Sequence, residues 1–245
     1  VLQPTNLKDP SFLEELRSYK ANLQIVVAFR MLPEVVWRMP ELGTFNLHAS
    51  LLPQYRGAAP INWAIINGEK ETGITTFFLK HEIDTGDLIF QEKEPIYPED
   101  TFETLYGRLM NKGAQLVLKT VEAIANNEYT LSPQDTTIDI KHAPKIHKET
   151  CKIDWNKTSF EIENFVRGLS PYPAAWTTIN GKHCKILRVK IANDKATKGE
   201  PGSMETDNKT YLLISTGNGQ VSVEELQMEG KKRMNITDFL RGNKL

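Results

Sequence analysis

The chain has 245 residues, of which 40% are hydrophobic and 25% are charged, and its formal net charge at pH 7 is -1. These values are typical of a soluble globular protein, and because no stretch approaches the ~20 apolar residues of a spanning helix, they exclude a membrane protein. The only two cysteines, Cys151 and Cys184, stand far apart outside any metal-ligand spacing, which excludes a disulfide framework, predicts no metal site and favours the cytoplasm.

The first 130 residues alternate between helix and strand patterns. The apolar run around Ile25–Val27 is typical of a strand that is covered on both faces, and Pro60 suits the first turn of a helix. We predict helices over residues 10–20, 33–39, 60–68 and 102–126, and strands over 23–29, 45–48, 73–79 and 88–91. Strands that alternate with helices predict parallel pairing, and therefore an α/β domain over residues 1–130.

The pattern changes after residue 130. Residues 131–148 are polar and irregular and contain two prolines, so they are predicted to be a linker. Thr158 and Glu161 then form a capping box that starts a helix. The hydrophobic period next becomes two, with hairpin signals such as Asn180-Gly181 between the runs. Residues 149–245 are therefore predicted to form a small antiparallel β-barrel.

The two parts of the chain differ in charge. Residues 1–140 hold 12 basic and 19 acidic side chains, whereas residues 141–245 hold 18 basic and 12 acidic ones. A basic excess of this size indicates either a surface that meets a polyanion or an ordinary solvated surface, and charge alone does not separate the two.

Three polar residues of the first part could converge on one site. Side chains two apart in a strand share a face, so Asn46 and His48 should project together from one strand end, where Asp84 could reach them. Amide and imidazole N–H groups can stabilise an oxyanion, and a carboxylate can orient the imidazole and take up a proton. This set suits attack by an amine on an acyl carbon and needs no serine or cysteine nucleophile.

Each of these residues also has a structural interpretation. Asn46 could satisfy a turn, His48 could be a buried structural histidine, and Asp84 could stabilise a tight turn through its side chain. Asp84-Thr85-Gly86 also matches the active-site triplet of aspartic proteases, which need two such carboxylates. Only one triplet is present, so a protease would have to be a homodimer, and the α/β alternation does not fit that all-β class.

Three motifs together resemble the signature of the folate-dependent formyltransferases. They are Asn-x-His-x-Ser-Leu-Leu-Pro from Asn46, Arg-Gly-Ala-Ala-Pro from Arg56 and Asp-Thr-Gly from Asp84. Segments 171–175 and 226–234 are similar to the carboxy-terminal domain of the branch that acts on methionyl-tRNA. The resemblance implies a partial Rossmann-like formyltransferase domain, without its N-terminal strands, followed by a small OB-like antiparallel β-barrel domain.

The resemblance also implies a reaction and its partners. A formyl group would pass from 10-formyltetrahydrofolate, the co-substrate, to the α-amino group of methionyl initiator tRNA, with Asn46, His48 and Asp84 as catalytic residues. The folate would be bound by Phe29, Arg30, Met31, Leu32, Ser50, Leu51, Leu52, Pro53, Arg56 and Gly57. The tRNA would be bound by Lys145, Lys231, Lys232 and Arg233.

The resemblance begins partway through the family's pattern. We therefore expect Val1 to be an internal residue of a longer protein, which is a monomer at full length. A sheet without its first strands leaves apolar edges unpaired, so we expect this chain alone to fold poorly or to associate. The chain also departs from the family at Phe29-Arg30, where members that act on tRNA usually have an aromatic residue and a glycine.

Two other functions remain open from the sequence. Another 10-formyltetrahydrofolate-dependent formyltransferase, or a formyl-folate hydrolase, would share the catalytic trio but would be expected to lack the basic segment 231–233. A catalytically inactive RNA-binding module would keep the fold without the reaction, although the intact trio argues against such decay.

Overall fold

The computed structural model describes residues 1–29, 31–193 and 199–245, so Arg30, a predicted folate-binding residue, lies outside the described residues. The chain packs as two compact units. The first consists of Val1–Pro60, Glu71–Pro95 and Arg108–Pro144, and the second of Ile61–Lys70, Ile96–Gly107 and Lys145–Leu245. The domain limits at 1–130 and 149–245 stay predictions. Among the described helices, none has the length and apolar character needed to cross a bilayer.

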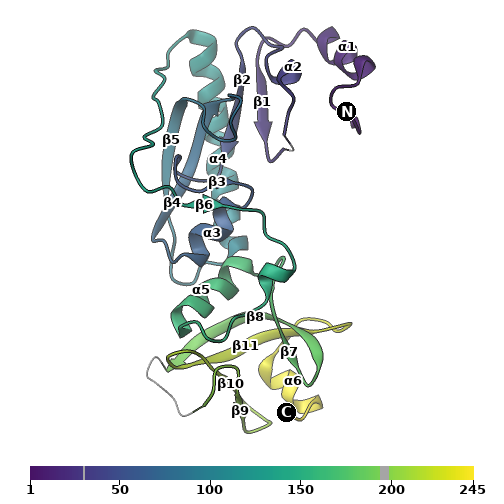
Figure 1. Cartoon of the computed structure of the whole chain (residues 1–245), viewed down its shortest axis with the longest axis vertical. Helices are drawn as coiled ribbons and strands as arrows, with labels where there is room; N and C mark the ends of the chain where they lie inside the picture. Colours follow the sequence, from purple (N-terminus) through teal and green to yellow (C-terminus); the bar gives the residue numbers. More distant parts are fainter. Residues whose placement is uncertain (30, 194–198) are drawn as a thin grey trace. The chain divides into compact units, whose positions relative to one another are not determined.

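A four-stranded mixed sheet forms the centre of the first unit (Figure 1). In spatial order its strands are β1 (Gln24–Val27), β2 (Thr44–His48), β4 (Glu71–Phe78) and β5 (Leu88–Pro95). β1 and β2 are parallel, as predicted, but β2–β4 and β4–β5 are antiparallel, so the expectation of parallel pairing is wrong there. For β4–β5 the reason is their connection, a loop without the helical crossover that parallel neighbours need, whereas β2 and β4 are antiparallel although α3 (Pro60–Ile66) lies between them in the chain.

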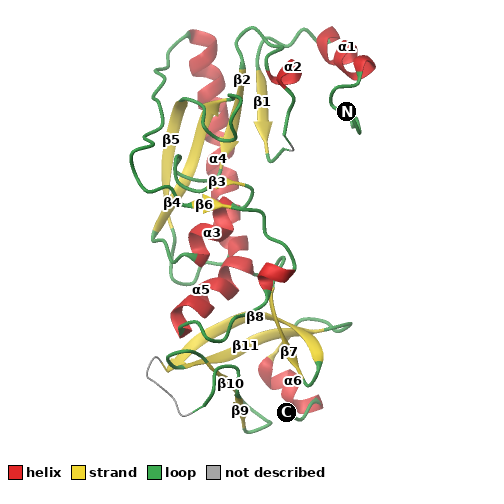
Figure 2. Ribbon diagram, in the orientation of Figure 1, coloured by secondary structure: helices red, strands yellow, loops and turns green. Residues whose placement is uncertain are grey.

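Helices accompany this sheet. They are α1 (Pro10–Ser18), α2 (Glu34–Trp37) and α4 (Phe102–Asn126), of which the part from Arg108 onwards belongs to the first unit. α4 has the predicted bounds and runs along the sheet in Figure 2. Its apolar stripe buries Ile124 against Phe45 of β2 and Ile89 of β5. This packing fixes the sheet from which the site residues project.

A second, very short pairing joins two distant segments of the first unit. β3 (Arg56–Gly57) and β6 (His142–Ala143) are parallel, with Arg56 opposite His142 and Gly57 opposite Ala143. Gly57 has φ +125°, and a Cβ atom at this position would collide with the carbonyl oxygen of Ala143. Only glycine fits such a close backbone approach. The pairing holds the segment after β2 next to residues that lie far along the chain.

The second unit is built on an antiparallel sheet. Its strands are β7 (Ala175–Ile179), β8 (Lys182–Asn193), β11 (Gln220–Met228), β10 (Leu212–Ser215) and β9 (Met204–Thr206), in this order, and β12 (Met234–Asn235) pairs with β11. The unit also holds α3 (Pro60–Ile66, from Ile61 on), the 3-10 turn η1 (Glu149–Cys151), α5 (Ser159–Leu169) and α6 (Ile236–Gly242). α5 and α6 bury Ile162 and Phe239 in one core with Ile186 and Val223 of the sheet.

Local signals of the second part are confirmed. Thr158 and Glu161 form the predicted capping box at the start of α5. Asn180 and Gly181 have φ values of +48° and +74° and join β7 to β8, as expected for the tight turn of a hairpin. The sequence interpretation missed β9, β12 and α6, although Ile236, Phe239 and Leu240 are spaced as on one helix face. The predicted mixture of an α/β domain and an antiparallel β domain is confirmed.

β1 lies at the end of the first sheet and pairs only with β2 among the described strands. Its side chains Ile25 and Val27 are 46% and 56% exposed, against the prediction that this strand is covered on both faces. The expectation failed because no element of the described chain packs on that face. An apolar edge strand is a template for association, so self-association stays a prediction.

Glu94 joins β5 to α4 through two ion pairs. The carboxylate is almost buried, and it accepts hydrogen bonds from Arg108 Nε at 2.8 Å and Lys112 Nζ at 2.6 Å. Burial raises the pKa of Glu94, but the hydrogen bonds and charges of Lys112 and Arg108 outweigh burial, so the pKa lies below its usual value. The folded state therefore stabilises the charged carboxylate.

Replacing Glu94 by alanine should lower the free energy of unfolding by about 2 to 3 kcal/mol, because charge-assisted hydrogen bonds to two cations are lost. Since the folded pKa is lowered, this contribution is fully present above the unfolded pKa of about 4.3 and is lost as the pH falls through the folded pKa. Urea unfolding of the wild type and of Glu94→Ala, at neutral pH and at about pH 3, measures the difference in the free energy of unfolding.

Glu71→Ala is the matched control for this prediction. Glu71 pairs with Lys93 at 2.8 Å on the same sheet, but both side chains are exposed, so the control should cost at most about 1 kcal/mol. An equal loss of stability in Glu94→Ala and Glu71→Ala at neutral pH would contradict the role of Glu94.

Candidate active site

β2 places Asn46 and His48 as the sequence predicted. Asn46 lies opposite Phe77 and His48 opposite Thr75 of β4, two positions apart on one face of the strand. The side chains are 4% and 6% exposed, so both are almost withdrawn from solvent. Buried polar groups need partners, and these partners define the site.

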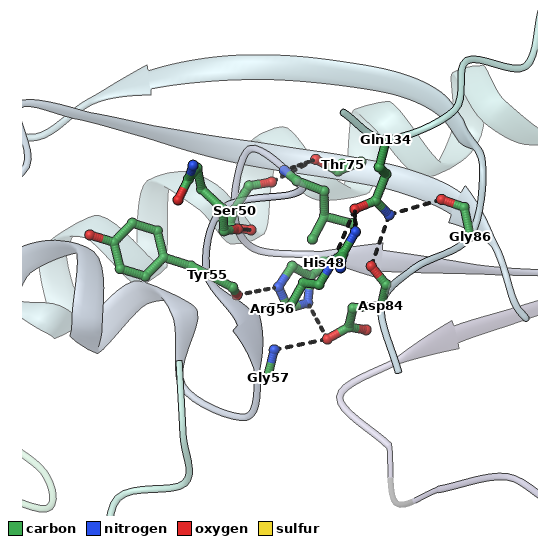
Figure 3. A network of polar contacts seen from close by, with 11 residues as sticks. His48, Ser50, Tyr55, Arg56, Gly57, Thr75, Asp84, Gly86 and Gln134 are labelled. Carbon is green, nitrogen blue, oxygen red and sulfur yellow. Dashed lines mark hydrogen bonds and ion pairs between the residues drawn. The ribbon is translucent and has the colours of Figure 1, made fainter. Parts of the chain in front are cut away.

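Asp84 reaches the imidazole of His48 from the loop between β4 and β5. Its Oδ2 atom lies 3.7 Å from His48 Nδ1 and accepts a hydrogen bond of 3.0 Å from Gly57 N (Figure 3). Asp84 has φ +55°, a left-handed conformation that is uncommon outside glycine but tolerated by aspartate. The structure therefore brings the two ionisable residues of the predicted trio together, at a distance longer than a direct hydrogen bond.

The other nitrogen of His48 has a fixed partner. Nε2 lies 2.9 Å from the carbonyl oxygen of Tyr55. A carbonyl can only accept, so Nε2 carries a proton and donates it. Nδ1 is consequently the nitrogen that faces Asp84, and a second proton at Nδ1 would lie between the ring and the carboxylate. The Tyr55 carbonyl thus sets the orientation of the ring, a contact that no sequence pattern predicts.

Asn46 has a buried side-chain atom without a hydrogen-bond partner. Its Oδ1 atom is inaccessible to solvent and contacts no donor among the described residues. The oxygen and nitrogen of an amide exchange places by a half-turn of the group, so this position can present either an acceptor or a donor. An unsatisfied amide beside a histidine–aspartate pair is typical of a site that completes its hydrogen bonds with a substrate.

The predicted folate-binding segment Ser50–Pro53 follows β2 and is largely buried. Ser50 Oγ donates to the Gln54 carbonyl at 2.6 Å, and Thr75 Oγ1 donates to the Ser50 carbonyl at 2.6 Å. Leu52 and Pro53 are buried and Leu51 is half-buried. These contacts hold the loop that carries Tyr55 to His48. Thr75, which the sequence interpretation did not single out, is the residue on which this loop depends.

Arg56 makes contacts that the sequence did not predict. Its Nε and Nη2 atoms donate to Gln134 Oε1 at 3.1 and 2.6 Å. Gln134 Nε2 in turn donates to the carbonyls of Asp84 and Gly86 at 2.8 and 2.9 Å. Gln134 lies in the segment predicted to be a linker, where a lone glutamine in polar sequence carries no recognisable signal.

Two cavities border the predicted folate residues. One, of about 640 Å³, is lined by Arg56 and Gln134 together with Trp37, Leu79, His81 and Thr85. The other, of about 700 Å³, includes Met31 and Leu32 in its lining. Phe29 and Met31 are exposed and follow β1, whose carboxyl end lies at the same sheet edge as that of its parallel neighbour β2. Of the predicted folate residues, Arg56 therefore lines one cavity and Met31 and Leu32 line the other, and neither lining includes Asn46, His48 or Asp84.

The predicted tRNA-binding residues lie in the second unit, and their charges are not equivalent. Lys145, Lys231 and Lys232 are exposed. Arg233 instead forms an ion pair with Glu225 of β11, through both Nε and Nη2. Arg233 is therefore partly neutralised within its own sheet. Among the residues that the structure describes, no cluster of histidine, cysteine or acidic side chains is arranged to hold a metal ion.

Two family models match the chain. The model described as "Formyl transferase" covers residues 1–121, and that described as "Formyl transferase, C-terminal domain" covers residues 145–244. A methionyl-tRNA formyltransferase of Parabacteroides distasonis is 56% identical over all of this chain and 78% of its own length. Another of Bacteroides fragilis is 54% identical over 99% of this chain and 77% of its own length. The chain thus spans somewhat over three quarters of these relatives.

Solved structures agree with the family models. A sugar 3N-formyltransferase, WlaRD, determined in the presence of dTDP and 5-N-formyl-THF, has 28% identity and a TM-score of 0.63 over 85% of this chain and 73% of its own. HypX from Aquifex aeolicus has a TM-score of 0.69 over 95% of this chain but only 41% of its own, and at 22% identity it supports the fold alone. By its two matching domains and its extensive identity to these relatives, the chain belongs to the formyl transferase family, in the branch of the methionyl-tRNA formyltransferases.

Proposed function

We propose that this protein transfers the formyl group of 10-formyltetrahydrofolate to the α-amino group of methionyl initiator tRNA. The observation that carries the proposal is the buried arrangement of Asn46, His48 and Asp84, with an unsatisfied amide next to a histidine–aspartate pair. This arrangement stands in a chain that is 56% identical to a methionyl-tRNA formyltransferase. Family membership supports the reaction, and the site supports a way to perform it.

Asn46 is proposed to stabilise the oxyanion. Attack of the amine on the formyl carbon forms a C–N bond and puts negative charge on the formyl oxygen. The carboxamide of Asn46 can turn its N–H group to that oxygen, because nothing in the described structure occupies its buried atom. A donor fixed before the reaction needs little reorganisation as the charge develops. In its protonated form His48 can add a second N–H from Nδ1, since Nε2 already donates to the Tyr55 carbonyl.

Asp84 is proposed to move the proton. The attacking amine must lose a proton, and the folate nitrogen must gain one when its C–N bond breaks. A carboxylate 3.7 Å from His48 can take the first proton, directly or through a water, and return it to the leaving nitrogen. Its charge also balances an imidazolium at His48. The Gly57 N–H fixes the oxygen that faces the ring, so the base is oriented before substrate binds.

The folate is proposed to bind beside this trio. A cavity of about 640 Å³ has the size of a typical small-molecule pocket, and Gln134 of its lining donates to the Asp84 carbonyl. Phe29, Met31 and Leu32, which follow β1, are proposed to contact the folate. Residues 50–53 are largely buried and are proposed to support the folate site. WlaRD was determined with a formylated folate, which is consistent with a donor of this class.

The tRNA is proposed to contact Lys145, Lys231 and Lys232. These exposed lysines can neutralise phosphates, whereas Arg233 is already paired with Glu225. A substrate of this kind is consistent with a protein that works with the translation machinery in the cytoplasm, and we propose that it acts as a monomer.

A product assay separates this proposal from its alternatives. The protein is incubated with 10-formyltetrahydrofolate and either methionyl initiator tRNA or buffer alone. Formyl-methionyl-tRNA is the expected product. Free formate in both reactions would indicate a hydrolase. A third reaction with an amino sugar in place of the tRNA would indicate the sugar-acting branch if that sugar is formylated, and tRNA binding without any of these products would favour an inactive RNA-binding module.

His48→Ala and Asp84→Asn should each lower kcat by about 100- to 1000-fold, because each removes a group that stabilises charge in the transition state. The affinity for methionyl-tRNA should stay within about 3-fold, since both residues are buried and neither belongs to the basic segments proposed to contact the tRNA. Formylation under single-turnover conditions and equilibrium tRNA binding measure the two quantities. Retention of more than a tenth of the wild-type rate by either variant would argue against these roles.

Asn46→Asp tests the oxyanion donor with almost no change of shape. A carboxylate cannot donate a hydrogen bond and repels the developing negative charge, so kcat should fall by about 1000-fold while the folate remains bound. The loss should be smaller at low pH, where a protonated aspartic acid can donate again. A pH–rate profile of Asn46→Asp that runs parallel to that of the wild type would contradict the role of Asn46 as a hydrogen-bond donor.

The double variant Lys231→Ala, Lys232→Ala should weaken tRNA binding and reduce the slope of log affinity against log salt by about 2, one for each lost phosphate contact. Lys190→Ala is the control, because Lys190 is paired with Glu224 at 3.0 Å and should change the slope little. Measurement of the tRNA affinities between about 50 and 200 mM salt gives the slope for each protein. Equal slopes for the double variant and the control would exclude these lysines from the interface.

A further inference from the structure

The structure assigns a positioning role to Gln134. We infer that this side chain fixes the main chain of the Asp84 turn and thereby sets the separation between the Asp84 carboxylate and His48. The inference rests on the proposed function, because Gln134 touches neither reacting group and would act only through Asp84. No motif of the sequence pointed to it.

Gln134 uses both ends of its amide. Its Oε1 atom accepts two hydrogen bonds from the Arg56 guanidinium, and its Nε2 atom donates to the carbonyls of Asp84 and Gly86. All four bonds have lengths between 2.6 and 3.1 Å (Figure 3). Both amide hydrogens and the oxygen therefore have partners, a pattern that only glutamine or asparagine can supply.

The Asp84 turn needs such support. Asp84 holds a left-handed conformation, and a Cβ atom at Gly86 would collide with the Phe78 carbonyl, so the turn is folded tightly back onto β4. Conformations of this kind persist only where the surroundings over-determine them. Gln134 donates hydrogen bonds to the carbonyls of the residues before and after Thr85, and these bonds stabilise the turn.

The hydrogen bonds of Gln134 and that of Gly57 connect both the main chain and the side chain of Asp84 to β3. Arg56 reaches the Asp84 main chain through Gln134, and the next residue, Gly57, donates its N–H to the Asp84 side chain. β3 is in turn anchored by β6. Main chain and side chain of Asp84 are therefore tied to the same two-residue strand, and a shift of the turn changes the 3.7 Å gap to His48.

This position matters because small displacements are costly in catalysis. A misplacement of about 1 Å by a residue outside the reacting groups can cost about 100-fold in rate. Loss of the four hydrogen bonds of Gln134 should therefore lower kcat and leave tRNA binding unchanged. If Gln134 serves only to stabilise the fold, its loss would lower stability without acting through Asp84.

Two variants and one control separate these roles. Gln134→Met keeps the length of the side chain and removes all four hydrogen bonds, and Gln134→Glu keeps the acceptor for Arg56 but removes both donors to the turn. Gln54→Met is the control, since Gln54 makes two comparable bonds, to Asp139 O and Lys141 N, without touching the Asp84 turn. Each is made in the wild type and in the Asp84→Asn background.

We expect Gln134→Met and Gln134→Glu to lower kcat for formylation by about 10- to 100-fold in the wild-type background, with the KM for tRNA within about 3-fold. In the Asp84→Asn background the same changes should cost less than about 3-fold, because the group they position no longer acts as a base. Gln54→Met should behave alike in both backgrounds. A melting temperature for each variant shows that the comparison concerns folded protein.

Equal losses in the two backgrounds, or a loss in Gln54→Met as large as that in Gln134→Met, would overturn the inference. Normal kcat in Gln134→Glu would also overturn it, since the donors to the turn would then be dispensable. Failure of the wild-type protein to formylate methionyl-tRNA would instead refute the proposed function, and single-turnover rates with wild type keep these two failures distinct.

Discussion

The burial of the Asp84 carboxylate beside His48 is the constraint on which the first unit depends. A carboxylate that is 8% exposed is stable only if hydrogen bonds and opposite charge replace its hydration. The partners come from Gly57 and His48, which are far from Asp84 in sequence. Residues that bring these segments together, such as Thr75, Gln134 and the β3–β6 pair, are therefore part of the chemistry even though they do not react.

The scaffold explains why an exposed loop can hold an oriented carboxylate. His48 is fixed by strand pairing with β4 on one side and by the Tyr55 carbonyl on the other. The loop that carries Tyr55 is held by the hydroxyl groups of Ser50 and Thr75, two fully buried residues. Such bonds are strong because water does not compete for them. Strand pairing thus fixes His48, whereas the Tyr55 loop and the Asp84 turn both depend on hydrogen bonds from side chains.

The sequence predicted those parts that follow from local rules. α4, the α5 capping box and the Asn180-Gly181 turn are encoded by periodicity, capping and backbone preference, and all three are confirmed. Side-chain alternation likewise placed Asn46 and His48 on one face. The direction of β4 and β5, the short β3–β6 pairing and the contacts of Gln134 depend on segments up to 86 residues apart, and no local pattern records them. The folate and tRNA assignments stay predictions, with Arg233 weakened by its pairing to Glu225.

Gly57 and Gly86 impose a limit on how this site can be altered by evolution or by engineering. At both positions backbone lies so close to backbone that any added carbon would displace a strand or the turn. Any substitution of either glycine would therefore displace the Asp84 carboxylate before the substitution could change which acceptor the protein prefers. New acceptor preferences have to arise at neighbours with room for side chains, such as Ala58 and Thr85, while the two glycines remain unchanged.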